Sequence, residues 1–365
     1  MNPSEKYYIN FDSKSTEVDL TEELVIGNTG FEGYFGVTYD MQTWDKLIQI
    51  LQTNNLNFTL SQKLSLLISS FICSYAQQEP FNVTLSVFQS LSNDQNEYTW
   101  VSASTLLTAI APLYQSQQYW PDMQNYIGNI YTSISNFVGW SSSTNPLAST
   151  SLRSTVLLMS TWFENQQVVS EGINITKNFI ENQTFYISPE SRRSAFFSYI
   201  RNSNEEDSFD KLYQIYSQTT DSSLKSDIFF ALGTSKDLSS VQMVLDTIGN
   251  RTDSPSTKLT LINNVLRYNK EARTIAFQKS VKIFNELKSL KNFSIDHYSY
   301  VRNVVYYFRA VVSNDQESQL LSSFLRENLS LFGTFFSSIQ SNSVSYNFRS
   351  VLYNTPFLEN FFTKK

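Results

Sequence analysis

One histidine and one cysteine in 365 residues leave little material for metal or nucleophilic chemistry. A catalytic zinc ion takes three protein ligands, usually with two or three imidazoles among them. His297 is the only imidazole, and the zinc-protease pattern His-Glu-x-x-His is absent. We therefore expect no catalytic residue, no metal site and no cofactor in this chain. Because Cys73 is the only thiol, an intramolecular disulfide is excluded.

Glycine and proline are also scarce, with 10 Gly and 8 Pro in the whole chain. Tight turns between strands depend on these two residue types. A large sandwich or barrel would need more of them, so the scarcity favours helices. Hydrophobic residues make up 41% of the chain, which is enough for a packed core.

The charge balance excludes some partners. The formal net charge is -6 and the sequence pI is about 5.0, so a basic footprint for nucleic acid is missing. No run of 18 apolar residues predicts a membrane span, and the first residues do not resemble a signal peptide. As written, the chain is expected in the cytoplasm; as a part of a longer chain, it would be extracellular or luminal.

The sequence also lacks the usual motifs for nucleophilic catalysis and for phosphate binding. No Gly-x-Ser-x-Gly turn exists for a serine nucleophile, and no Gly-rich phosphate loop is present. Cys73 follows the apolar run 66–72, which is typical of a buried structural thiol. His297 lies near a predicted helix start, where a capping or solvent-facing role is the simpler interpretation and a general base is the alternative.

Two charged clusters are candidate sites. The acidic cluster consists of Glu205, Glu206, Asp207 and Asp210. Carboxylates in the first turn of a helix oppose its dipole, and a metal or acid–base pair is the alternative. The basic cluster consists of Lys279, Lys282, Lys288 and Lys291. A solvated helix face is the simpler interpretation, and a patch for a peptide carboxylate or an acidic partner is the alternative.

Residues 1–40 differ from the rest of the chain. The segments 7–9, 24–26 and 34–39 are short and rich in β-prone residues, and Gly27, Gly30 and Gly33 punctuate the turns between the last two. We expect two to four short strands here, as a remnant of a β-sandwich.

From Met41 onward the apolar period is that of a helix. One stripe runs from Leu60 to Tyr75, another from Trp100 to Tyr114 with Pro112 near its end, and a third from Met123 to Val138. A further stripe covers 301–312.

Boundary signals accompany these stripes. Ser61 is a candidate N-cap, and Ser188–Pro189 and Ser254–Pro255 are typical of helix starts. Gly233 is typical of a helix end, and the polar stretch 141–146 is the best candidate for a long loop.

About fifteen amphipathic segments of this kind fit before Lys365. Short-looped helices of this length must pack antiparallel to bury their apolar faces. We therefore predict an all-α fold, a curved superhelical array of antiparallel helical hairpins similar to HEAT repeats. The expected domains are 1–40 and 41–365.

Residues 33–40 read Gly-Tyr-Phe-Gly-Val-Thr-Tyr-Asp and are followed by Trp44 and Leu47. They resemble the segment Gly-Tyr-Tyr-Arg-Val-Asn-Tyr-Asp, then Trp-x-x-Leu, of the aminopeptidase N family of zinc aminopeptidases, which includes the endoplasmic-reticulum and puromycin-sensitive enzymes. There the segment links a small β-sandwich to the C-terminal helical domain. Residues 97–100 and 231–237 resemble later family motifs, and the likeness covers roughly residues 20–250.

The departures from the family pattern matter. The motif Arg is replaced by Gly36, a Pro by Thr99, and a pair of Asp residues by Ser69–Ser70. The family's catalytic domain, with its zinc motif and its Gly-Ala-Met-Glu-Asn motif, is absent from this sequence, so no catalytic residue is carried over.

The resemblance implies a non-catalytic, aminopeptidase-like helical domain that binds a peptide or a partner protein, such as a related aminopeptidase, through its concave face. The residues that make these contacts are unknown. The alternative is a C-terminal fragment of a zinc metalloaminopeptidase that caps the active site and restricts peptide access in the whole enzyme. An unrelated helical scaffold is the third interpretation.

Overall fold

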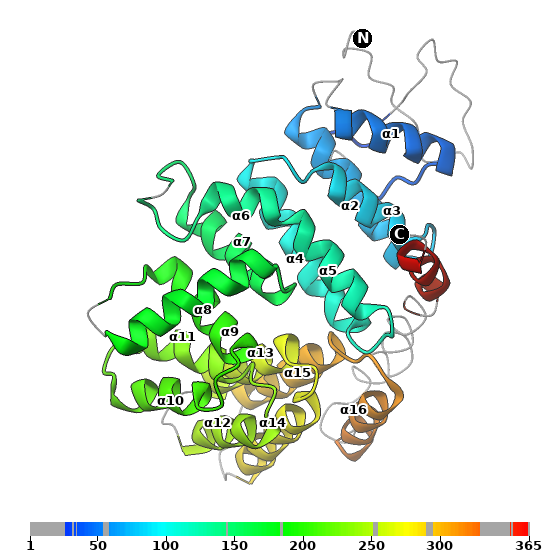
Figure 1. The fold of residues 1–365 in the computed structure, drawn as a ribbon. Coiled ribbons are helices and arrows are strands. Elements are labelled where there is room, and N and C mark those ends of the chain that lie inside the picture. The colour runs from blue at the N-terminus through cyan, green and yellow to red at the C-terminus, as the bar shows by residue number, and fades with distance from the viewer. Residues whose placement is uncertain are drawn as a thin grey trace.

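A computed structural model of the chain describes residues 26–30, 33, 35–53, 58–143, 145–182, 185–250, 255–289, 295–328, 351 and 353–363. Within them the regular elements are helices (Figure 1). The labelled helices are α1 Met41–Thr53, α2 Leu60–Tyr75, α3 Phe81–Ser90, α4 Glu97–Tyr114, α5 Trp120–Ile130, α6 Thr132–Val138, α7 Thr150–Trp162, α8 Gln166–Glu181, α9 Pro189–Asn202, α10 Ser208–Gln218, α11 Ser222–Leu232, α12 Leu238–Asn250, α13 Pro255–Tyr268, α14 Arg273–Lys288, α15 Ile295–Arg309 and α16 Asp315–Glu327. Residues 353–363 form a further helix, called here the C-terminal helix.

Most of the predicted boundaries are confirmed. Pro189 and Pro255 begin α9 and α13, and Gly233 is the C-cap of α11. Helix α4 ends two residues after Pro112, because a proline removes a donor from the last turn. Among the described helices, none combines the length and the hydropathy that crossing a bilayer requires.

The predicted cap of α2 is wrong. Thr59, and not Ser61, is the N-cap: its hydroxyl accepts from the Gln62 backbone N–H, and the Gln62 side chain accepts from the Thr59 backbone N–H. This reciprocal pair is a capping box, which satisfies two otherwise free donors. Ser61 instead donates its hydroxyl proton to the carbonyl of Thr29 at 2.5 Å.

The structure also differs from the sequence-based expectation in the stripe 123–138 and in residues 35–40. The stripe from Met123 to Val138 forms two helices, α5 and α6, separated by a turn at Tyr131. Residues 35–40, where a strand was expected, form a connecting segment without strand pairing to other described residues. The segment 7–9 and residues 24 and 25 lie outside the described residues, so the domain boundary at residue 40 stays a prediction.

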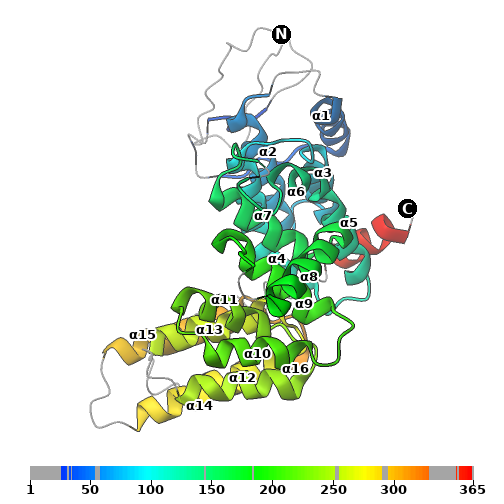
Figure 2. The ribbon, with the colours of Figure 1, turned by 60° about the vertical axis from the view of Figure 1, so that its left-hand side comes forward.

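The apolar side chains form two cores. The first core lies mainly in α1–α7, includes the fully buried Trp44 and Trp100, and extends to single residues of α8, α9, α11, α13 and the C-terminal helix. The second core lies within α8–α16 and includes the fully buried Phe284 and Phe308. Figure 2 shows the corresponding arrangement, a column that contains α1–α7 and an arm that contains α11–α16.

From α7 onward, each odd-numbered helix also contacts the next odd-numbered helix. Helix α9 packs against α7, α8 and α11, and α13 packs against α11, α14 and α15. Helix α4 packs against α2, α7 and α13, so it belongs to both the column and the seam with the arm. The odd-numbered helices from α7 to α15 therefore form one continuous row.

The end of the chain returns to its beginning. The Asn354 side-chain carbonyl accepts from the Phe81 backbone N–H at 2.8 Å, and its amide donates to the Ser74 carbonyl at 3.4 Å. Asn354 is fully buried, and Leu358 of the C-terminal helix belongs to the first core. Figure 1 shows this helix, in red, beside α3.

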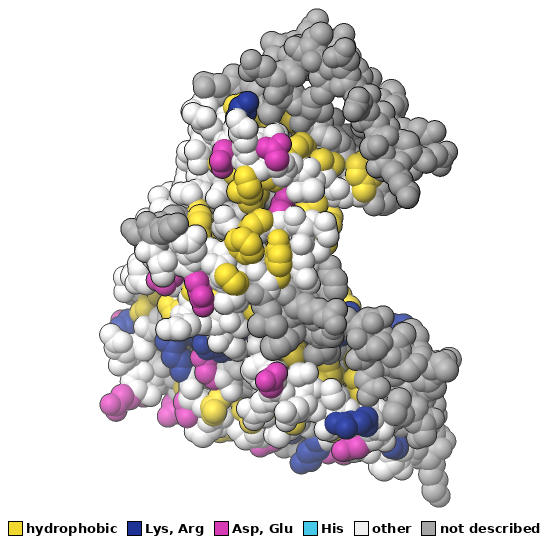
Figure 3. Space-filling model, turned by 90° about the vertical axis from the view of Figure 1, so that its right-hand side faces the viewer, with side chains coloured by type: hydrophobic (Ala, Val, Ile, Leu, Met, Phe, Trp, Pro, Cys, Tyr) yellow, Lys and Arg dark blue, Asp and Glu magenta, His cyan; other side chains and the backbone are white. Residues whose placement is uncertain are grey.

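Charge is distributed unevenly between the two parts. Residues 41–186 carry four of the chain's 27 Lys and Arg residues and eight of its 33 Asp and Glu residues. In Figure 3 the upper part shows mainly hydrophobic and uncharged side chains, whereas blue and magenta side chains are more frequent below.

Candidate functional site

Of the two residues considered first for catalysis, Cys73 is described with its side chain, whereas the side chain of His297 lies outside the described part of the structure. Cys73 is buried in α2, as predicted, and burial together with the nearby Glu79 carboxyl raises the pKa of its thiol to about 11. A thiol in this state is a poor nucleophile at neutral pH. His297 lies in the first turn of α15, as predicted. No group of three or more metal-ligating side chains occurs among the described residues.

The acidic cluster is a structural junction. The Glu205 carboxylate is 2.7 Å from Lys177 Nζ of α8 and 3.0 Å from Lys211 Nζ of α10, and it accepts from the Tyr199 hydroxyl of α9 at 2.7 Å. These hydrogen bonds lower the pKa of Glu205 to about 2. Asp207 pairs with Lys211 as well. Glu205 therefore joins α8 and α10 through ion pairs and α9 through a hydrogen bond.

The basic cluster does not form one solvated face. Lys279 is 8% exposed, and its ammonium group lies 3.0 Å from Asp246 Oδ1 of α12. Lys288 donates to the Asn328 side chain at 3.4 Å. Lys282 is exposed, and Lys291 lies outside the described residues. The expected solvated face is therefore interrupted, because Lys279 and Lys288 hold α14 against neighbouring segments.

An apolar groove runs between α2, α3 and α4. Two pockets that share Phe71 and Phe81 lie in it, each with a volume of about 10 Å³. The side chains that line them include Leu67, Tyr75, Thr84, Leu85, Phe88, Ala103, Leu106, Leu107, Ile110, Leu113 and Tyr114. A small-molecule site usually measures about 300–1,000 Å³. Each pocket therefore has room for about one water molecule and cannot enclose a substrate.

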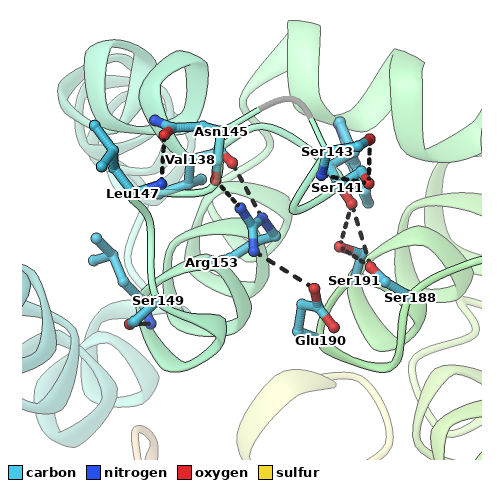
Figure 4. A network of polar contacts seen from close by, with 12 residues as sticks. Val138, Ser141, Ser143, Asn145, Leu147, Ser149, Arg153, Ser188, Glu190 and Ser191 are labelled. Carbon is cyan, nitrogen blue, oxygen red and sulfur yellow. Dashed lines mark hydrogen bonds and ion pairs between the residues drawn. The ribbon is translucent and has the colours of Figure 1, made fainter.

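Arg153 fixes the loop between α6 and α7 (Figure 4). Its fully buried guanidinium donates to the Val138 carbonyl at 3.1 Å and to the Asn145 carbonyl at 2.8 Å, and it lies 3.5 Å from Glu190 Oε1 of α9. A buried cation requires such partners. The supported loop carries Leu147 with 85% of its surface exposed.

A second buried arginine joins the column to the arm. Arg273 donates to the Leu266 carbonyl, to Ser313 Oγ at 3.0 Å and to the Gln115 side chain, and it lies 3.8 Å from Glu317. Burial lowers the pKa of its guanidinium to about 10, against the opposite effect of Glu317. Ser116 and Ser313 also share a hydrogen bond of 2.7 Å. These contacts hold the turn after α4 against α14 and α16.

The connecting segment 35–40 is held by a buried carboxyl. Glu79, between α2 and α3, accepts at Oε2 from Thr38 Oγ1 at 2.7 Å and from Trp44 Nε1 at 2.8 Å. Desolvation outweighs these two hydrogen bonds and raises the pKa of Glu79 to about 7. Gly36 lies so close to α2 that a Cβ atom there would be 3.3 Å from Ile72 and from Cys73.

Comparison with known proteins shows similarity to the C-terminal part of aminopeptidases. The profile of the ERAP1-like C-terminal domain matches residues 24–342. Human glutamyl aminopeptidase is 20% identical over 277 residues, which cover 76% of this chain and 28% of that protein. Aminopeptidase N of Plutella xylostella is 23% identical over 212 residues, covering 58% of this chain and 22% of that protein.

Aminopeptidase A of Gloydius brevicauda is 20% identical over 251 residues, covering 68% of this chain and 26% of that protein. The helical fold and the extent of the profile match define the class, the C-terminal domain of a zinc aminopeptidase family. The chain belongs to the ERAP1-like C-terminal domain family. It spans about a quarter of the length of the relatives described above.

Sequence reasoning missed the buried charges. The buried residues Glu79, Arg153 and Arg273 each connect separate segments of the fold, yet none of them was a candidate site residue in the sequence analysis. Arg153 had a usable signal, because it lies three and four residues before the buried Val156 and Leu157 and therefore on the apolar face of its helix. Glu79 had none, since it lies in a turn, where an acidic residue is expected in solvent.

Proposed function

We propose that this chain is a non-catalytic binding domain of the aminopeptidase type, whose helices form a curved HEAT-like array. The observation that supports this most is the family match, which concerns the C-terminal helical domain. The continuous row of odd-numbered helices and the bend between the column and the arm (Figure 2) fit such an array. Its concave face would engage a peptide or a partner protein, such as a related aminopeptidase.

The chemistry of the surface favours an apolar contact. The groove between α2 and α4 offers the partly exposed side chains of Phe71, Tyr75 and Leu106, and few charges lie in this half of the chain. Burial of apolar surface in a groove is a common way to recognise a peptide segment. We propose that this groove is part of the binding surface.

The test is binding of fluorescently labelled peptides of mixed sequence, followed by anisotropy. Leu106→Glu places a charge on the rim of the groove and should weaken binding at least tenfold. Leu147→Glu, in an exposed loop that lies outside the groove, is the matched control and should bind like the wild type. Equal affinity of both variants would remove the groove from the proposal.

The alternative is that the chain is the C-terminal part of a zinc aminopeptidase and caps its active site. The length of the relatives favours this candidate, because the matched region covers only 22–28% of them. Genomic sequence upstream of Met1 decides between the two. An in-frame His-Glu-x-x-His motif there would establish the alternative, and its absence across the whole upstream reading frame would support the stand-alone domain.

A further inference from the structure

Glu79 differs from the other buried charged groups in how its atoms are satisfied. Only 3% of the residue is exposed. One oxygen, Oε2, accepts both of its hydrogen bonds, while Oε1 is buried without a hydrogen-bond partner. An ionised carboxylate normally needs partners on both oxygens when it is removed from water. The arrangement therefore suits a carboxyl that carries its proton on Oε1.

The neighbouring groups do not compensate a negative charge. The connecting segment presents Tyr39, whose hydroxyl accepts from the Gly27 N–H, and α2 presents the Cys73 thiol. Asp45 and Lys46 of α1 are exposed, and α3 carries no titratable residue. Among the described residues, no Lys, Arg or His forms an ion pair with Glu79. The pKa values of both titratable neighbours are raised above their ordinary range, so both stay neutral at neutral pH and supply no positive charge to Glu79.

We propose that Glu79 is a proton-operated latch, in which the neutral carboxyl holds residues 35–44 on α2 and loss of its proton to water loosens that segment. Thr38 and Trp44 are the two points at which the latch is attached. Tyr39 packs edge to face on Trp44, with ring centroids 4.9 Å apart, so the segment moves as a unit. The inference does not depend on the identity of any partner.

The sign of the effect follows from linkage. Burial raises the pKa of Glu79 from its ordinary 4.5 to about 7 in the docked segment, and exposure to solvent would restore the ordinary value. The docked state thus binds the proton more tightly. Docking should weaken as the pH rises from 4.5 to 7, by up to tenfold per pH unit and by about three-hundredfold in total, and then stay constant.

Hydrogen exchange of the amides in 35–44 tests the latch on the whole chain. After correction for the intrinsic pH dependence of exchange, the wild-type protection should fall as the pH rises from 5 to 7 and should level off between pH 7 and pH 8. Amides of α9 serve as an internal reference, because that helix does not contact the segment. A protection factor for 35–44 that stays constant over this range would overturn the proposal, without recourse to any variant.

Two variants sharpen the test. Glu79→Gln keeps the shape and cannot ionise, so it should retain protection at pH 8 and exchange at least tenfold more slowly there than the wild type. Glu181→Gln removes an exposed carboxyl of α8 and should reproduce the wild-type profile. If Glu79→Gln followed the wild-type pH profile, another group would be responsible and the assignment to Glu79 would be wrong.

Discussion

Trp162 and Tyr268 pack edge to face, with ring centroids 4.8 Å apart and ring planes at 68°. Trp162 ends α7 of the column, and Tyr268 ends α13 of the arm. Tyr268 also contacts Phe197 and Phe230, with centroid distances of 6.1 and 5.2 Å. These four rings, which we call the aromatic knot, all belong to the first core and carry it from α7 across α9 and α11 to the end of α13.

Removal of the central ring of this knot should separate the two parts. Tyr268→Ala deletes three aromatic contacts and leaves a cavity, so we expect a loss of about 3–4 kcal/mol in the free energy of unfolding. Urea denaturation should then show two transitions where the wild type shows one. Tyr98→Ala, at a site that is 67% exposed, should change stability by less than about 0.5 kcal/mol. A single, unshifted transition in Tyr268→Ala would contradict a coupling role.

The contrast between this knot and the predicted helices shows what sequence reasoning reached. Apolar periodicity located α2, α4 and α15, because one buried face per helix imposes a spacing of three and four residues. The same reasoning says nothing about which faces meet. Tyr268 and Trp162 carry no local signal of their contact, since it depends on how two distant helix ends approach each other.

Loss of the buried cation in α7 should disrupt the loop that it supports. Arg153→Met leaves the carbonyls of Val138 and Asn145 without donors and Glu190 without its partner. We expect a destabilisation of about 3–5 kcal/mol and faster hydrogen exchange in 145–149. Lys46→Met removes an exposed cation from α1 and serves as the control, with no measurable effect expected. Stability of Arg153→Met within about 0.5 kcal/mol of the wild type would show that the network contributes nothing.

Gly128 marks a close approach of α5 to the backbone after α7. A Cβ atom at this position would lie 2.4 Å from the Phe163 carbonyl oxygen, and the Asn165 side chain donates to the Gly128 carbonyl at 2.9 Å. Alanine favours helix by about 1 kcal/mol over glycine. Here the clash should dominate, so Gly128→Ala should lower the melting temperature. Asn125→Ala, on the exposed side of the same helix, should leave it unchanged or raise it.

The ion-pair junction around Glu205 should be visible at low pH. Because its partners lower the pKa of Glu205 to about 2, its contribution is present above pH 4.5 and is lost as the pH falls toward 2. Glu205→Gln should cost about 1 kcal/mol at pH 7 and approach zero cost at pH 2. Glu206→Gln, at the exposed neighbouring position, is the matched control. A cost that persists unchanged to pH 2 would assign the effect to packing.

The contacts between helices were less predictable from the sequence than the helices themselves, because these contacts join residues that are far apart in sequence. Composition and spacing report whether a segment buries a face, and they identified Cys73 as buried and Gly233 as a helix end. They do not report a tertiary hydrogen bond such as that between Asn354 and Phe81, whose partners are far apart in sequence. The resemblance to aminopeptidases supplied some of this missing information. It identified residues 33–40 as a connecting segment, and the structure shows that Thr38 of this segment and the following Trp44 both donate to Glu79.

The central proposal is that this chain contributes binding and not hydrolysis. The most direct measurement is release of the reporter group from aminoacyl substrates by the purified chain, with added zinc and with a chelator, together with the bound zinc content. We predict no chelator-sensitive turnover and no stoichiometric zinc. Tightly bound zinc at one ion per chain, accompanied by turnover that the chelator abolishes, would contradict the account.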